Sequence, residues 1–253
     1  MKINDIITEA GVKPYEKQVI NTDKVETILR QFCPAYDNLL VSPIWRGVKN
    51  HDEPILKIDP STGVRQSQNT TNYYTELMDH NPHYNGWPKR SRSLICTTDF
   101  KRAVNYSDSG RDSVYAVFPG RGAKVAVCPG MDIWETEAII PFFGGYTSFP
   151  DINYYLQELG LPPVYEEMLS AVKSSWFKKN LIRWCTEQFK SEAPDPALFL
   201  PIIMEGMSPN NTHSRLLSVE EYANSGIQGR ELWIGDPVII VKASIIDSLK
   251  YLR

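Results

Sequence analysis

Residues 91 to 129 decide the predicted fold and read SRSLICTTDFKRAVNYSDSGRDSVYAVFPGRGAKVAVCP. The segment contains three strand-like runs rich in Val, Ile and Tyr and one helical run: Ser93–Thr97, Val114–Phe118, Lys124–Cys128 and, helical, Asp99–Tyr106. Turn residues with Pro-Gly or clustered Gly separate the runs. The first strand ends in the hydroxyls of Thr97 and Thr98 and turns at once into a helix that Asp99 can cap. Such a corner is a common place to hold a ligand.

The bulk composition is that of a soluble globular protein. The chain has 253 residues, of which 42% are hydrophobic and 23% charged. The net charge of -3 gives no overall positive field for nucleic acid, although Lys89, Arg90, Arg92, Lys101 and Arg102 can form a local basic patch. No apolar run approaches the length of a membrane span, and the first residues lack the pattern of a signal peptide. We therefore expect a cytoplasmic protein without a membrane partner.

The cysteine and histidine spacing predicts neither a metal site nor a disulfide. The four cysteines lie far apart and form no C-x-x-C pair, so they are expected to be small buried residues in a reducing compartment: Cys33, Cys96, Cys128 and Cys185. His80 and His83 have a spacing that a metal can use, but no further ligand cluster lies near them.

The remaining chain predicts an α+β organisation. Residues 1–37 are expected to form a helical segment, with helices at Ile3–Glu9 and Thr22–Phe32. Residues 38–145 and 226–253 are expected to form the sheet-containing core, and residues 146–225 a helical insertion. Further strands are predicted at Leu39–Trp45, Glu231–Ile234 and Val238–Val241. The last two are expected to form a hairpin with its turn at Gly235–Pro237. The segment Asp132–Phe143 fits either a capped helix or an extended run.

Three motifs on these strands follow a recognisable order. Ile44-Trp45-Arg46-Gly47 ends the first strand with an arginine, Leu94-Ile95-Cys96-Thr97-Thr98 ends the next in hydroxyls, and Glu231 opens a strand near the C-terminus. In this order the sequence resembles the ADP-ribosyltransferase superfamily, whose arginine, serine and glutamate motifs stand on successive strands. The second motif is also similar to proteins of tailed bacteriophages with the same fold. The resemblance implies a split mixed or antiparallel sheet core with a helical insertion.

The glutamate motif has two candidates. Glu231 is favoured because the following GDPVIIV matches the way in which the family's glutamate strand turns into its last strand. The alternative is Glu137 with Glu135, which reproduces the family's Glu-x-Glu before an apolar run and a proline. If Glu231 is the motif residue, the position two before it is Gly229, so the first acid of Glu-x-Glu is missing.

The resemblance implies that NAD is the substrate. Its ADP-ribose would pass to a macromolecular acceptor, protein rather than nucleic acid, and nicotinamide would be released. Glu231, Thr97 and Thr98 would be catalytic, and no metal is needed. The residues expected to contact NAD are Arg46, Gly47, Cys96, Tyr106 and Tyr74.

A competing interpretation is a protein-binding or phage structural module that keeps the fold without the activity. Cys96 at the family's serine position and the missing Glu-x-Glu favour this alternative.

Overall fold

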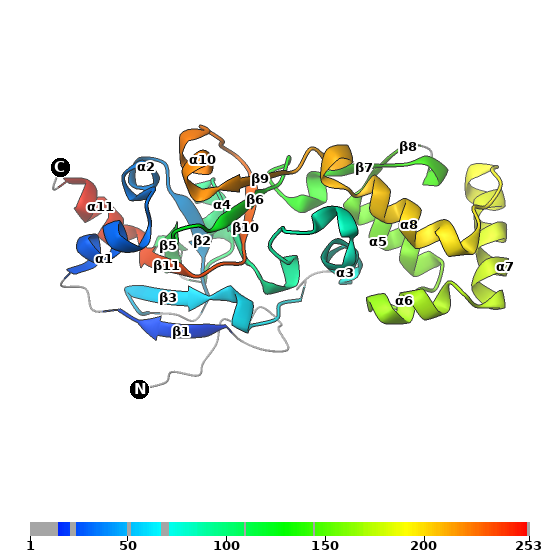
Figure 1. Ribbon diagram of the computed structural model, residues 1–253, viewed down its shortest axis with the longest axis horizontal. Helices are drawn as coiled ribbons and strands as arrows, with labels where there is room; N and C mark the ends of the chain where they lie inside the picture. The colour runs from blue at the N-terminus through cyan, green and yellow to red at the C-terminus, as the bar shows by residue number, and fades with distance from the viewer. Residues whose placement is uncertain are drawn as a thin grey trace. The chain divides into compact units, whose positions relative to one another are not determined.

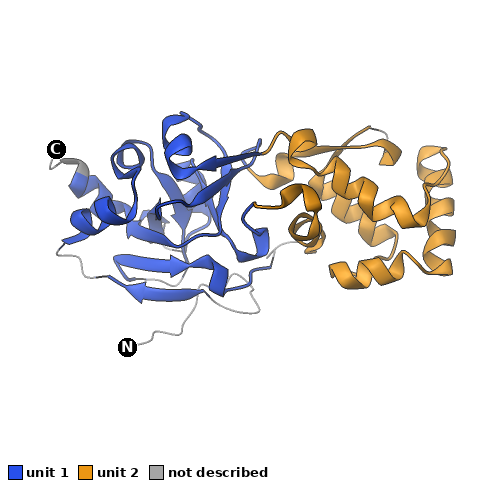
Figure 2. Cartoon of the chain, viewed as in Figure 1, with its two compact units in different colours: residues 1–66, 87–131, 215–253 blue, residues 67–86, 132–214 orange. Residues whose placement is uncertain are grey.

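The structure is a computed structural model that describes residues 15–20, 24–49, 52–66, 71–108, 110–143 and 145–251. The chain divides into two compact units (Figure 2). The first comprises residues 1–66, 87–131 and 215–253, and the second comprises residues 67–86 and 132–214. The chain therefore enters the second unit twice and returns twice.

Within the described residues, the first unit contains a nine-stranded sheet in which all neighbouring strands are antiparallel (Figure 1). Its order is β1-β3-β11-β5-β2-β4-β10-β6-β9. The strands are β1 (Glu16–Val19), β2 (Ile44–Gly47), β3 (Ile55–Asp59), β4 (Leu94–Thr97), β5 (Val114–Pro119), β6 (Lys124–Val127), β9 (Arg215–Ser218), β10 (Glu231–Ile234) and β11 (Val238–Lys242). The predicted α+β class with an antiparallel sheet is confirmed.

The strands β2 and β4 are paired over a shorter length than the other neighbouring strands of the sheet. They pair at one position, Trp45 with Thr97. Two short links, at 120–123 and at Gly235–Pro237, each join strands that have three others between them in the sheet order. A three-residue link spans only about 13 Å, whereas those strands would lie about 19 Å apart in a flat sheet. The sheet is therefore strongly bent, and the predicted hairpin of β10 with β11 is wrong.

Helices cover both faces of this sheet. They are α1 (Val25–Phe32), α2 (Tyr36–Val41), α4 (Phe100–Asn105), α10 (Val219–Asn224) and α11 (Ala243–Tyr251). Leu29 of α1 and Leu39 of α2 share the main core with Ile44 of β2. The next residue of β2, Trp45, packs against Phe100 of α4 with ring centroids 4.9 Å apart. Alternation along β2 thus places α1 and α2 on one face and α4 on the other.

Residues 91–129 form the predicted elements. The carboxylate of Asp99 accepts hydrogen bonds from the N–H groups of Lys101 and Arg102, at 2.8 and 3.3 Å, and so caps α4. All six residues of β5 are buried, which explains why its sequence is continuously apolar.

Two predictions about the N-terminal part are wrong. Residues 39–41 belong to helix α2 rather than to a strand, because Tyr36, Leu39 and Leu40 have the i, i+3, i+4 spacing that buries one helical face. The segment 1–37 is not wholly helical either, since β1 pairs with β3 at the edge of the sheet. The predicted helix at Ile3–Glu9 and the start of the next at Thr22 lie outside the described residues.

The second unit is mainly helical. Its elements are α3 (Tyr73–His80), β7 (Glu137–Ile140), β8 (Gly145–Ser148), α5 (Phe149–Glu158), α6 (Tyr165–Ala171), α7 (Ser175–Trp184) followed by one π-helical turn (Cys185–Phe189), α8 (Pro196–Gly206) and α9 (Pro209–Thr212). Aromatic rings hold it together: Phe143, Tyr155, Trp184 and Phe189 have neighbouring centroids 4.7 to 6.0 Å apart. The ambiguous run 132–143 contains a strand, β7, which pairs with β8.

The unit boundaries differ from the expected ones. Residues 215–225, expected in the insertion, belong to the first unit because β9 pairs with β6. Residues 67–86 and 132–145, expected in the core, belong to the second unit. No helix in the described ranges combines the length and apolar character needed to cross a membrane.

Candidate functional site

The three motifs lie on three neighbouring strands. β2, β4 and β10 are consecutive in the sheet, and Thr97 of β4 is paired with Trp45 on one side and with Glu231 on the other. Directly opposed residues of antiparallel strands point to the same face. Trp45, Thr97 and Glu231 therefore form one row across the sheet, although 186 positions separate the first from the last.

The two threonines form the corner next to Glu231. The Thr98 N–H donates to the Arg230 carbonyl at 3.0 Å, and the Arg230 N–H donates to Thr98 Oγ1 at 2.9 Å. Thr97 Oγ1 accepts the N–H of Asp99 at 3.0 Å and so helps the strand to turn into α4. Both threonines are buried. Their hydroxyls stabilise the corner, and Thr98 also ties it to the residue before Glu231.

Arg46 does not share this row. It follows Trp45 along β2, so alternation starts its side chain on the opposite face. Its Nη1 donates to the carbonyl of Ile95 on β4. The arginine of the first motif thus contacts the second motif strand, while a different cation meets the glutamate.

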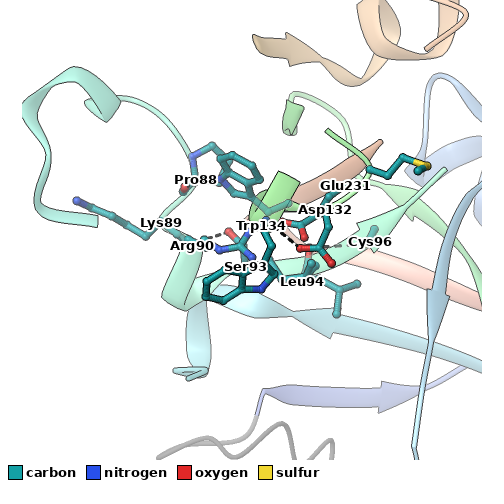
Figure 3. A network of polar contacts seen from close by, with 12 residues as sticks. Pro88, Lys89, Arg90, Ser93, Leu94, Cys96, Asp132, Trp134 and Glu231 are labelled. Atoms are coloured by element: carbon teal, nitrogen blue, oxygen red, sulfur yellow. Dashed lines mark hydrogen bonds and ion pairs between the residues drawn. The ribbon is translucent and has the colours of Figure 1, made fainter. Parts of the chain in front are cut away.

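Arg90 contacts Glu231. Arg90 Nη1 lies 2.5 Å from Glu231 Oε1, and the two side chains are only 3% and 9% exposed (Figure 3). The sequence placed Arg90 in a surface patch of basic residues. Its position 141 residues before Glu231 gives no local signal of the contact, so sequence reasoning missed it.

The surroundings of Arg90 hold the guanidinium in place. Its Cζ lies 5.5 Å from the ring centroid of Trp233, two residues after Glu231 on β10. The Trp233 Nε1–H donates to the Pro88 carbonyl at 3.2 Å, and Ser93 Oγ donates to the Lys89 carbonyl at 2.6 Å. The short 3-10 turn Arg90–Arg92 is therefore anchored on both sides. A cation over an indole face is a favourable arrangement.

The other residues expected to contact NAD occupy varied positions. A Cβ on Gly47 would lie 2.1 Å from the Ala103 carbonyl oxygen, so this glycine permits the close approach of β2 to α4. Cys96 is buried in the main core. Tyr106, the residue after α4, is 53% exposed. Tyr74 is buried inside the second unit, where it packs edge-on against Trp134. Among these, Tyr106 alone offers an exposed ring.

The alternative glutamates lie outside the nine-stranded sheet. Glu137 begins β7 and Glu135 ends a 3-10 turn, both in the second unit and both exposed. They share no strand pairing with the arginine or hydroxyl motifs. Of the three candidate glutamates, Glu231 alone pairs with a residue of the hydroxyl motif, Thr97.

Within the described residues, no group of three or more His, Cys, Asp or Glu side chains is placed to hold a metal ion. Comparison of the chain with protein-family models, with curated proteins and with solved structures finds no match.

Proposed function

We propose that this protein cleaves the bond between nicotinamide and ribose in NAD and transfers ADP-ribose to a macromolecular acceptor, a protein rather than a nucleic acid. The observation that carries the proposal is the row of Trp45, Thr97 and Glu231 across β2, β4 and β10. This row makes neighbours of three motifs that are far apart in the sequence.

The reaction requires a carboxylate near the ribose. As the glycosidic C–N bond breaks, its electron pair leaves with the nicotinamide nitrogen and the ribose acquires oxocarbenium character. The carboxylate of Glu231 would accept a hydrogen bond from a ribose hydroxyl and stabilise this developing charge. The acceptor's nucleophilic atom then bonds to the anomeric carbon and loses its proton to water or to a base.

The remaining residues would bind rather than react. Thr97 and Thr98 hold the corner that positions Glu231. Arg46, whose side chain starts on the opposite face of β2, would support this corner through its contact with the Ile95 carbonyl of β4. Tyr106 is exposed and would stack on the nicotinamide ring. A protein acceptor fits a cytoplasmic enzyme, or one acting in the host cytoplasm if a phage encodes it.

Release of nicotinamide by the purified protein tests this function. We expect turnover of NAD by the wild type and a loss of at least about 100-fold in kcat for Glu231→Gln, which keeps the shape but removes the charge. Glu220→Gln, an exposed glutamate in α10, is the matched control and should turn over normally. Equal rates for wild type and Glu231→Gln would rule out the role of Glu231.

A second candidate function is a protein-binding module without activity. Its supporting observation is the number of large apolar side chains of the second unit that are exposed: Ile139, Tyr146, Tyr154, Val164, Trp176, Ile182 and Leu198. Such side chains are typical of an interaction surface where they adjoin in one patch.

Calorimetric titration with NAD separates the two functions. Saturable binding that weakens in Arg46→Ala supports the enzyme. The absence of a binding signal supports the module and excludes NAD as a substrate.

A further inference from the structure

We infer that Arg90 is a positioning residue for Glu231, an inference that rests on the proposed function. Arg90 lies outside the three motifs and comes from the segment that precedes β4. The juxtaposition that carries the inference is the 2.5 Å contact of its Nη1 with Glu231 Oε1, between two side chains that are nearly inaccessible to solvent.

A glutamate side chain needs a partner to hold its carboxylate in one orientation. Three rotatable bonds lie between its backbone and its oxygens, and a catalytic group must stay within about 0.5 Å of its productive position. The backbone of Glu231 is fixed, since its N–H donates to the Gly130 carbonyl at 3.2 Å and its carbonyl accepts from the Cys128 N–H at 2.9 Å. The carboxylate then requires a fixed donor, which Arg90 provides.

Arg90 is itself held at three places. Trp233 lies beneath its guanidinium, and the same indole binds the Pro88 carbonyl two residues before Arg90. On the other side, Ser93 binds the Lys89 carbonyl through its hydroxyl, and its own carbonyl accepts from the Tyr15 hydroxyl at 2.9 Å. A cation that served solubility alone would not have such anchors.

The neighbouring arginine shows the contrast. Arg92 belongs to the same 3-10 turn, but it is exposed and donates to the Ser61 carbonyl at 3.1 Å. Two arginines in one turn therefore differ in burial and in partner. This makes Arg92 a matched control for Arg90.

The inference also assigns a chemical reason for arginine at position 90. A planar guanidinium directs several N–H donors in one plane and lies flat on an indole, whereas a lysine ammonium is a point charge on a flexible stem. Lysine would keep the buried charge but would define the carboxylate orientation less well. Methionine would keep most of the volume and remove the charge.

The experiment compares Arg90→Met, Arg90→Lys and Arg92→Met with the wild type in steady-state nicotinamide release, at temperatures where each variant is folded. We expect kcat to fall at least tenfold in Arg90→Met and by a smaller factor in Arg90→Lys. The KM for NAD should change by less than about threefold, because the ground-state contacts remain. Arg92→Met should behave as the wild type.

The outcomes separate the two proposals. A wild type that releases no nicotinamide overturns the proposed function and the role of Arg90 with it. An active wild type and a folded Arg90→Met of unchanged kcat overturn the role of Arg90 alone. If Arg90→Met does not fold, the test rests on Arg90→Lys. A kcat of Arg90→Lys equal to that of the wild type overturns the positioning role, whereas a lowered kcat with an unchanged KM supports it.

Discussion

Arg90 and Glu231 form a buried ion pair with 2.5 Å between Nη1 and Oε1. Glu231 belongs to β10, which lies between β4 and β6 in the sheet, whereas Arg90 belongs to the segment leading into β4. Two opposite charges removed from water are tolerated when they lie at hydrogen-bond distance. The pair therefore fixes the segment before β4 onto β10, whichever role the glutamate has in catalysis.

Breaking this pair should destabilise the fold strongly. Arg90→Met removes the cation that contacts the buried Glu231 carboxylate, and we expect a loss of about 3–5 kcal/mol in the free energy of unfolding. The double variant Arg90→Met/Glu231→Leu should recover most of that loss because both charges are gone. Urea denaturation of the two single variants and the double variant gives the coupling energy. Additive losses would contradict the pairing.

An exposed pair of the same unit serves as the comparison. Arg111 and Asp247 also contact each other, but their side chains are 64% and 40% exposed. Asp247→Asn is expected to change the free energy of unfolding by less than about 1 kcal/mol. A similar loss at both pairs would mean that burial does not set the difference.

The sequence predicted the local elements of the sheet better than their partners. Val, Ile and Tyr between turn residues identified β4, β5 and β6, because each run is short and sharply bounded. Strand order depends on contacts between residues far apart in the sequence. The short link at Gly235–Pro237 therefore predicted that β10 and β11 pair as a hairpin, although they are not neighbours in the sheet. The same limit applies to α2. From the sequence alone, the apolar run after Tyr36 fits a strand as well as a helix, and only the tertiary structure shows that Tyr36, Leu39 and Leu40 are buried together on one helical face.

Gly47 should not tolerate a side chain. A methyl group there would clash with the Ala103 carbonyl oxygen, which belongs to the backbone of α4 and moves only with the helix. We expect Gly47→Ala to lower the free energy of unfolding by about 1–3 kcal/mol or more. Thermal denaturation measures the effect, and Val41→Ala, at a position 79% exposed, is the control with little change expected. If Gly47→Ala unfolds at the same temperature as the wild type, the close approach of β2 to α4 is contradicted.

The candidate site was only partly predictable. Thr97, Thr98 and Glu231 could be named because the motif order places them on strands that turn out to be adjacent. Arg90 could not be named, since nothing in its neighbourhood differs from an ordinary basic turn. Tyr74 shows the opposite limit: its aromatic ring suggested stacking on a ligand, and the structure uses it for packing inside the second unit.

The N-terminus of α10 should give a measurable pH dependence. Ser218 donates to Glu221 from its backbone N–H at 2.7 Å, and its hydroxyl accepts the Glu221 N–H at 3.2 Å. The hydrogen bond that the Ser218 backbone N–H donates to the carboxylate, followed by one from the Ser218 side chain, lowers the pKa of Glu221 below its ordinary 4.5. A lowered carboxyl pKa stabilises the folded state above the unfolded value, and that contribution is lost as the pH falls through the folded value. The difference in Tm between wild type and Glu221→Gln should therefore shrink on acidification; a constant difference would contradict the assignment.

The four cysteines should be unreactive in the folded protein. All are free and buried, and burial raises the pKa of Cys33 to about 12. At about pH 8 its thiolate fraction is then on the order of one in ten thousand. We expect a thiol reagent such as DTNB to label no cysteine before denaturation and all four afterwards. Rapid labelling of the native protein would contradict the burial of these thiols.

The hydroxyl of Thr98 should protect the backbone next to Glu231. Thr98→Val removes the acceptor of the Arg230 N–H and replaces it with a methyl group of similar size. We expect a loss of about 1–3 kcal/mol in the free energy of unfolding and faster hydrogen exchange of the Arg230 amide, because a partly buried donor loses its partner. Thr98→Ser keeps the hydroxyl and should retain the slow exchange. If Arg230 exchanges equally in both variants, the hydroxyl does not hold the corner, and the link between the second motif and Glu231 depends on the strand pairing alone.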